Sequence, residues 1–145
     1  RDDIKDVLAE TERQDVKVIS TDYVVQDDQY KALYPDMLQA IVINNGGDDI
    51  KDMVIAFAGW DDNKLPVKIK GNIDFSDGSY IKEVSCKDIN LVSGDTYGSD
   101  SGFEIDENNN IKAIVVSYED FDGETWYNPY YDAWSDYYSG ARYSE

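Results

Sequence analysis

The chain has 145 residues, with 31 acids, 13 bases and no histidine, which gives a formal net charge of −18. One domain is expected at this length, and because so acidic a surface repels a phosphate backbone, no nucleic acid partner is predicted. Cys86 is the single cysteine, so the chain has no intrachain disulfide and no cluster of thiolate metal ligands. The sequence contains no run of about 18 apolar residues, so no membrane-spanning segment is predicted.

Residues 1–14 carry the only early helical signal. Ile4, Val7 and Leu8 fall on one stripe, and acids gather in the first turn, where the helix dipole favours them. Because this stripe is narrow, residues 1–15 are predicted to form a lead-in helix or stalk outside the core, followed by a single β domain at 16–145. The chain begins at Arg1 rather than Met, so we expect a fragment or mature form whose leader or anchor is missing.

From Val16 onward the hydrophobic pattern changes from helical to extended. Runs rich in Val, Ile, Tyr and Phe are typical of strands, and clusters of Asn, Asp and Gly between them are typical of turns. The expected strands are residues 16–25, 37–44, 50–60, 66–75, 79–86, 89–92, 102–105 and 111–121.

The strand runs differ in how apolar their two faces are. Residues 40–43, 53–58 and 113–116 are apolar on both faces or nearly so, which indicates central strands covered by another layer. The alternating "VKIK" at 67–70 indicates an edge strand protected by charge. Many strands without interleaved helices predict an all-β, antiparallel sandwich or barrel, and we favour a sandwich of about seven to eight strands.

The segment 118–138, "YEDFDGETWYNPYYDAWSDYY", is rich in aromatic and acidic residues. Asn128 is placed to cap a helix, Pro129 to occupy its first position, and Gly140 to end it. The segment is therefore predicted to contain the last strand, a Gly turn and a short capping helix with Trp126 packed under it. The helix would lay an aromatic stripe onto the sandwich through Tyr130, Trp134 and Tyr137 or Tyr138.

Acidic turns raise the question of calcium. Acids pair at 27–28, 48–49 and 61–62, and "EDFDGE" spans 119–124. An EF-hand register starting at residue 106 lacks the required Gly and Glu, and one starting at residue 118 fails at both ends, with Tyr118 first and Pro129 last. The favoured interpretation is a type I′ "DG" turn at 122–123 among solvated acids, with no cofactor. An irregular calcium site formed by Asp120, Asp122 and Glu124 stays open as the alternative.

Two further kinds of site can be tested on the residues. Trp60, Trp126 and Trp134 could stack on sugar rings, but burial of these rings in the core is the favoured interpretation. No spacing singles out a pair of catalytic carboxylates, and without histidine neither a Ser–His–Asp set nor an activated Cys86 can be built. No catalytic residue is therefore assigned, and no enzyme activity is expected.

Several motifs resemble a known class of domain. They are "LQAIVINNGGDDIKDMVIAFAGWDDNKLPVKIKG", "DFSDGSY", "SGDTYG" and "YEDFDGETWYNPYYDAW", in which "DG-TW-NP" is the most specific element. Over residues 16–138 the chain resembles uncharacterised, immunoglobulin-like β-sandwich domains, of unknown function, from secreted or membrane-anchored proteins of Gram-positive bacteria. The resemblance implies a sandwich fold and an extracytoplasmic or cell-surface location, with the first helix as a stalk, and supplies no catalytic or binding residues.

The favoured function is a non-enzymatic extracytoplasmic module, a spacer or protein-interaction domain of a bacterial envelope protein. The first alternative is a module that binds carbohydrate or cell wall, with or without calcium. A weaker alternative is an acidic, inhibitor-like domain whose Tyr-rich face docks a basic protein. The expected partners are therefore a protein or a glycan at the cell surface.

Overall fold

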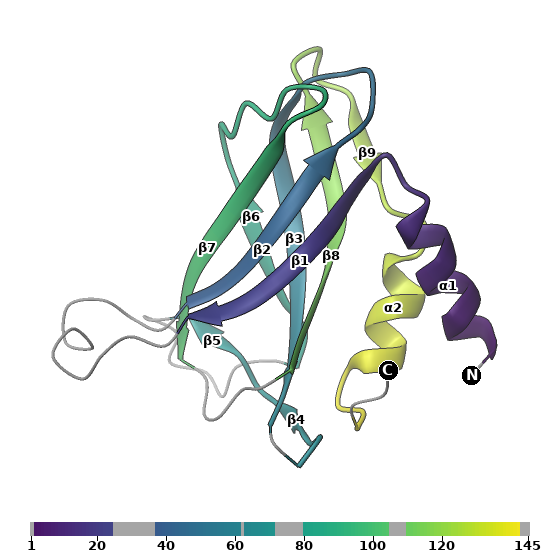
Figure 1. Cartoon of the computed structure of the whole chain (residues 1–145), viewed down its shortest axis with the longest axis vertical. Coiled ribbons are helices and arrows are strands. Elements are labelled where there is room, and N and C mark those ends of the chain that lie inside the picture. Colours follow the sequence, from purple (N-terminus) through teal and green to yellow (C-terminus); the bar gives the residue numbers. More distant parts are fainter. Residues whose placement is uncertain (1, 25–36, 62, 72–79, 105–109, 143–145) are drawn as a thin grey trace, which may run out of the picture.

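The structure, a computed structural model, describes residues 2–24, 37–61, 63–71, 80–104 and 110–142. In this part of the chain two antiparallel β-sheets face each other and two short helices lie on one side (Figure 1). This mostly-β arrangement is consistent with the predicted sandwich. Neither helix is long and apolar enough to cross a membrane, among the residues described.

The first sheet has four strands in the order β1-β2-β7-β5, and the second has the order β4-β3-β8-β9, with β6 also paired to β3. The strands expected to be central, β2, β3 and β8, each have a neighbour on both sides. The elements are α1 (Asp2–Glu12), β1 (Val16–Val24), β2 (Met37–Asn44), β3 (Ile50–Trp60), β4 (Pro66–Val67), β5 (Lys70–Gly71), β6 (Lys82–Cys86), β7 (Thr96–Glu104), β8 (Asn110–Asp120), β9 (Thr125–Tyr127) and α2 (Tyr131–Tyr138).

Strand β3 is buried on both faces and separates two apolar clusters. One face contributes Ile55 and Phe57 to an aliphatic cluster between the sheets, which also includes Val42 of β2. The other face contributes Ala56 and Ala58 to a second cluster, shared with α2. The domain therefore has three layers: sheet, sheet and helices.

The second cluster is aromatic. Trp60, Trp134 and Tyr138 are 0%, 2% and 2% exposed. The Tyr138 ring lies edge-on to Trp60 at 5.5 Å and to Trp134 at 5.2 Å between centroids. The indole N–H of Trp60 donates to the carbonyl of Ala141 at 2.7 Å, so its polar group is satisfied and the chain after α2 is held to the end of β3.

Helix α1 belongs to this layer, in contrast to the expectation of a stalk outside the core. Its predicted stripe, Ile4, Val7 and Leu8, packs half-buried against the aromatic cluster. Just after the helix, the side-chain amides of Gln14 and Asn128 exchange hydrogen bonds of 3.0 and 3.3 Å. A narrow stripe suffices because α2 offers a large aromatic surface beside it.

Two expected strands differ in the structure. The run 66–75 gives two short strands in different sheets, since β4 pairs with β3 and β5 pairs with β7; both lie at sheet edges, as the "VKIK" pattern predicted. The run 89–92 forms only one bridge, between Leu91 and Ile50. Positive φ angles of 53° at Asp88 and 47° at Asn90 prevent a continuous strand there.

Other strands were missed or misplaced. Strand β7 starts at Thr96 rather than residue 102. Its first half was missed because Tyr97 is the one large apolar residue in its sequence. The short strand β9 was not predicted. Strand β6 starts at Lys82 rather than residue 79. The expected features at 25–36, 72–79 and 105–109, including the acids at 27–28, lie outside the described residues.

The C-terminal helix is present, but its start was predicted wrongly. It begins at Tyr131 after Tyr130, which makes no side-chain cap. Asn128 is buried instead: its Oδ1 accepts the N–H of Tyr130 at 2.9 Å, and its Nδ2 donates to the carbonyl of Val115 at 2.8 Å. Gly140 follows the helix with a φ of 66°, as a terminating glycine should.

Candidate functional site

The acids proposed for calcium build a hairpin turn. One carboxylate oxygen of Asp120 accepts the backbone N–H groups of Asp122 and Glu124, both at 2.9 Å. Asp120 donates its own N–H to the carbonyl of Glu124, and Gly123 takes a φ of 85°. Because Asp122 is not left-handed, this is a three-residue loop with a left-handed glycine rather than the expected type I′ turn.

The turn after β3 repeats this pattern. Asp61 accepts the backbone N–H groups of Asn63 and Leu65 at 2.9 and 3.0 Å, and Lys64 occupies the left-handed position with a φ of 66°. Asp49 likewise accepts the N–H of Ser93 at 3.0 Å. Carboxylates at the predicted turns thus bind backbone amides, and nowhere in the described part of the chain do three acidic, Cys or His side chains group to hold a metal ion.

The three tryptophans do not form an exposed platform. Trp60 and Trp134 are buried in the helix-facing cluster, as the core interpretation predicted. Trp126 is half-buried, but it lies on the other cluster rather than under α2: its ring stacks on Tyr118 at 4.9 Å between centroids. The sequence could not place Trp126 because the strand β9 that carries it was not recognised.

A shallow groove of about 150 Å³ near the start of β3 contains two opposed acids, Asp52 and Glu119. Asp52 accepts the backbone N–H of Asp88 at 2.9 Å. This hydrogen bond, helped by the charges of Lys87 and Lys51, lowers the pKa of Asp52 below its ordinary value. A carboxyl group that stays ionised is suited to accepting hydrogen bonds, and unsuited to the role of a general acid.

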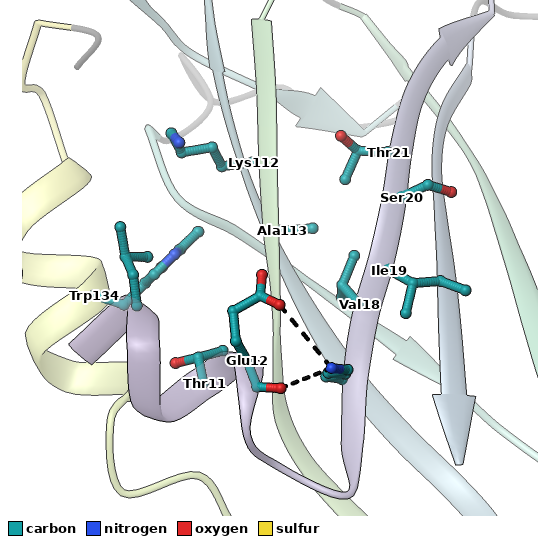
Figure 2. Close-up of a pocket in the computed structure, with 11 residues that line it drawn as sticks. Thr11, Glu12, Val18, Ile19, Ser20, Thr21, Lys112, Ala113 and Trp134 are labelled. Carbon is teal, nitrogen blue, oxygen red and sulfur yellow. Dashed lines mark hydrogen bonds and ion pairs between the residues drawn. The ribbon is translucent and has the colours of Figure 1, made fainter. Parts of the chain in front are cut away.

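A larger cleft of about 300 Å³ opens between α1 and the two sheets. In Figure 2, α1 contributes Thr11 and Glu12 on one side, β1 forms the opposite side, and β8 passes behind with Lys112 and Ala113. Trp134 of α2 closes the cleft beside α1. The cleft is thus where the first sheet, the second sheet and the helical layer meet.

The β1 side of this cleft is a strand edge. Five consecutive residues, 17–21, line it, whereas the face of a strand would contribute only alternate side chains. Strand β1 is terminal in its sheet and pairs only with β2 among the described strands. Between Val18 and Ser20 the pairing register shifts, and the intervening Ile19 is 50% exposed.

Strand β8 presents a second edge to the same cleft. Its outer side is covered by β9 only at Ser117–Glu119. Nearer its start, the carbonyl of Ile111 accepts the Thr21 hydroxyl at 3.2 Å, and the carbonyl of Val115 accepts the Asn128 amide. Because carbonyl directions alternate along a strand, the carbonyl of Ala113 is expected on the same side as these two, and of the three residues only Ala113 lines the cleft.

The two lysines of the cleft are both engaged within the chain. Lys17 Nζ donates to the carbonyl of Glu12 at 2.7 Å and lies 4.0 Å from its carboxylate, as the dashed lines in Figure 2 show. Lys112 Nζ lies 5.4 Å from the centre of the Tyr138 ring. Sequence reasoning missed this cleft, since its sides come from segments some 90 residues apart, such as Thr21 and Ile111.

Comparison with known proteins gives two matches. The profile of a family of unknown function, DUF5780, matches residues 37–141. A crystal structure of a hypothetical protein from Peptoclostridium difficile 630 is similar in fold, with a TM-score of 0.70 and 12% identity over 90% of this chain and 94% of that chain. No curated protein matches the sequence. Within the cleft, β8 and α2 lie inside the family match, whereas α1 and β1 precede it.

Proposed function

This chain belongs to the DUF5780 family of unknown function, and on that premise we propose that it is a non-enzymatic, protein-binding module of a bacterial surface protein. The cleft between α1 and the β1 edge is its binding region. An immunoglobulin-like arrangement of the two sheets and an extracytoplasmic location, both implied by the sequence resemblance, are part of the same proposal.

The observation that carries the proposal is the strand edge along the cleft. Residues 17–21 border an open space next to the exposed side chain of Ile19, and an uncovered strand edge is a template for pairing with another chain. The first alternative, stacking on glycans, has less support, because Trp60 and Trp134 are buried.

The non-enzymatic part of the proposal is supported by how the polar groups are used. Asp61 and Asp120 bind backbone amides of their own turns, and the pKa of Asp52 is lowered. The Cys86 side chain is buried in the cluster between the sheets. These groups serve the fold.

Site-specific photo-crosslinking in the native cell tests the function. A crosslinking amino acid replaces Glu12, whose side chain is 80% exposed at the cleft, and in a matched strain it replaces Leu65, which is 46% exposed in a distant turn. A discrete protein adduct at position 12 that is absent at position 65, and that external protease removes from intact cells, is expected. Adducts at neither position, or only to glycan, would contradict the proposal.

A further inference from the structure

The turn between β2 and β3 contains an asparagine–glycine pair, Asn45 and Gly46. In such a pair the backbone nitrogen of the glycine can attack the side-chain carbonyl carbon, Cγ, of the asparagine, because glycine has no side chain to obstruct the approach. We infer that Asn45 is a latent deamidation site, and that the buried Asn44 holds the reaction back in the folded domain. This inference is independent of the cleft and of the function proposed above.

The reaction needs no partner other than water. Ring closure forms a bond between the Gly46 nitrogen and Cγ of Asn45, the nitrogen loses its proton, and the side-chain amide leaves as ammonia. Water then opens the cyclic imide at either of its carbonyl carbons, which yields aspartate or isoaspartate. Each product adds a negative charge near Asp48 and Asp49, and isoaspartate also adds a methylene group to the main chain.

The surroundings of Asn45 leave room for this reaction. Asn45 is exposed, so water reaches its side chain. Gly47, the second glycine of the turn, borders open space, since a Cβ added there would meet no atom within 4 Å. Ring closure is therefore opposed mainly by the backbone, because the Gly46 nitrogen has to turn toward Cγ of Asn45.

Hydrogen bonds hold the backbone around the reacting atoms. The N–H of Gly46, at the attacking nitrogen, donates to Oδ1 of Asn44 at 3.0 Å. The N–H of Asn45 donates to the carbonyl of Asp15 at 2.8 Å, and the carbonyl of Gly46 accepts the hydroxyl of Ser93. Ring closure has to break the first of these bonds, because the Gly46 nitrogen must rotate and give up its proton.

Asn44 is itself anchored in the core. It is 0% exposed, and its Nδ2 donates to the carbonyls of Asp48 at 2.9 Å and Leu91 at 3.1 Å. Turning this amide would leave buried polar groups without partners, so its orientation is fixed. The acceptor of the Gly46 N–H is therefore held in place, and the turn reaches the reactive geometry only when this network opens locally.

Peptide mapping by mass spectrometry measures the reaction. The chain is incubated in mildly alkaline buffer, folded or unfolded in guanidinium chloride, and fragment ions distinguish conversion of Asn45 from that of Asn44. We expect conversion of Asn45 in the folded chain to be at least about tenfold slower than in the unfolded chain. Equal rates would show that the fold does not hold the reaction back. Without conversion in the unfolded chain, Asn45 would not be a deamidation site.

A pair of variants tests the role of Asn44. Asn44→Ala removes the acceptor of the Gly46 N–H and should speed conversion of Asn45 at least about fivefold over the wild type. The matched control is Ile114→Ala, which removes a buried side chain from the second, aromatic cluster and so lowers stability without changing the turn. Equal acceleration in the two variants would mean that global unfolding, rather than Asn44, sets the rate.

A milder variant keeps the test decisive if Asn44→Ala does not fold. Ser93 is exposed, and Ser93→Ala removes only its hydroxyl bond to the carbonyl of Gly46. Conversion of Asn45 should then be about two- to threefold faster than in the wild type. Circular dichroism verifies that each variant is folded, and an unchanged rate in Ser93→Ala would contradict the account of a turn held closed by its hydrogen bonds.

Discussion

The two apolar clusters on either side of β3 are built from different residues. Toward the first sheet, β3 presents Ile55 and Phe57 to mostly aliphatic side chains, whereas toward the helices it presents the small Ala56 and Ala58, with Trp60 at its end. These small residues leave room for the large ring of Trp134 on α2. The comparison shows that the aromatic C-terminal segment completes the core, and that α1 and α2 form a third layer that stops short of the β1 edge.

The largest effect is expected from removing one ring of the second, aromatic cluster. Trp134→Ala removes a buried indole and should lower the free energy of unfolding by about 3–5 kcal/mol. Urea denaturation followed by far-UV circular dichroism and by Trp fluorescence measures the loss. Because both clusters share β3, the two signals should change together.

The matched control is Tyr127→Ala, since this ring is 72% exposed. It should change the free energy of unfolding by no more than about 0.5 kcal/mol. If Trp134→Ala were equally mild, or if the helices unfolded separately from the sheets, the helical layer would not be part of one core.

The next effect concerns the polar link between α1 and the sheet. Asn128→Ala leaves the buried carbonyl of Val115 without its donor and removes the partner of Gln14, which should cost about 1–3 kcal/mol. Gln14→Ala removes only the second contact and should cost less. Urea denaturation of both variants decides the order, and a larger loss for Gln14→Ala would show that Asn128 is not the anchor.

The two similar turns at opposite ends of the second sheet allow a smaller test. Gly123→Ala should lower the free energy of unfolding by about 1 kcal/mol, because a φ of 85° strains the backbone of any residue with a Cβ. The added Cβ meets no atom within 4 Å, so it neither clashes nor gains a contact that would offset the strain. Lys64→Gly, at the equivalent left-handed position, should be neutral or raise stability by about 0.5 kcal/mol. Thermal and urea unfolding measure both, and a destabilising Lys64→Gly would mean that the lysine side chain supports its turn.

The smallest effect is a pH dependence at the edge of the helical layer. Burial and a 3.0 Å hydrogen bond to Glu83 raise the pKa of Tyr131 to about 12. Since this folded-state pKa exceeds the ordinary value of 10.0, the contribution to stability is complete below about pH 10 and is lost as the pH rises toward about 12. The stability difference between the wild type and Tyr131→Phe should therefore shrink between about pH 9 and 11.5, and a constant difference would contradict this assignment.

Local patterns predicted the central strands well. The apolar, β-branched runs at 37–44 and 50–60 are β2 and β3 with the predicted bounds, because a doubly buried strand needs apolar residues on both faces. Strand β7 was misjudged, since pairing with β2 places "TYGSDSG" in the sheet although Tyr97 is its one large side chain. The cleft could not be predicted from any single segment, because its lining comes from α1 and β1 and also from β8, which lies far from them in the sequence.

Amide hydrogen exchange of the free domain tests most directly whether the β1 edge is open. If it is, alternate amides within residues 17–21 should exchange quickly, because they point into the cleft, while the amides between them and those of β2 stay protected. Uniform protection along β1 would show that its edge is covered, and would contradict the account of this cleft as a binding region.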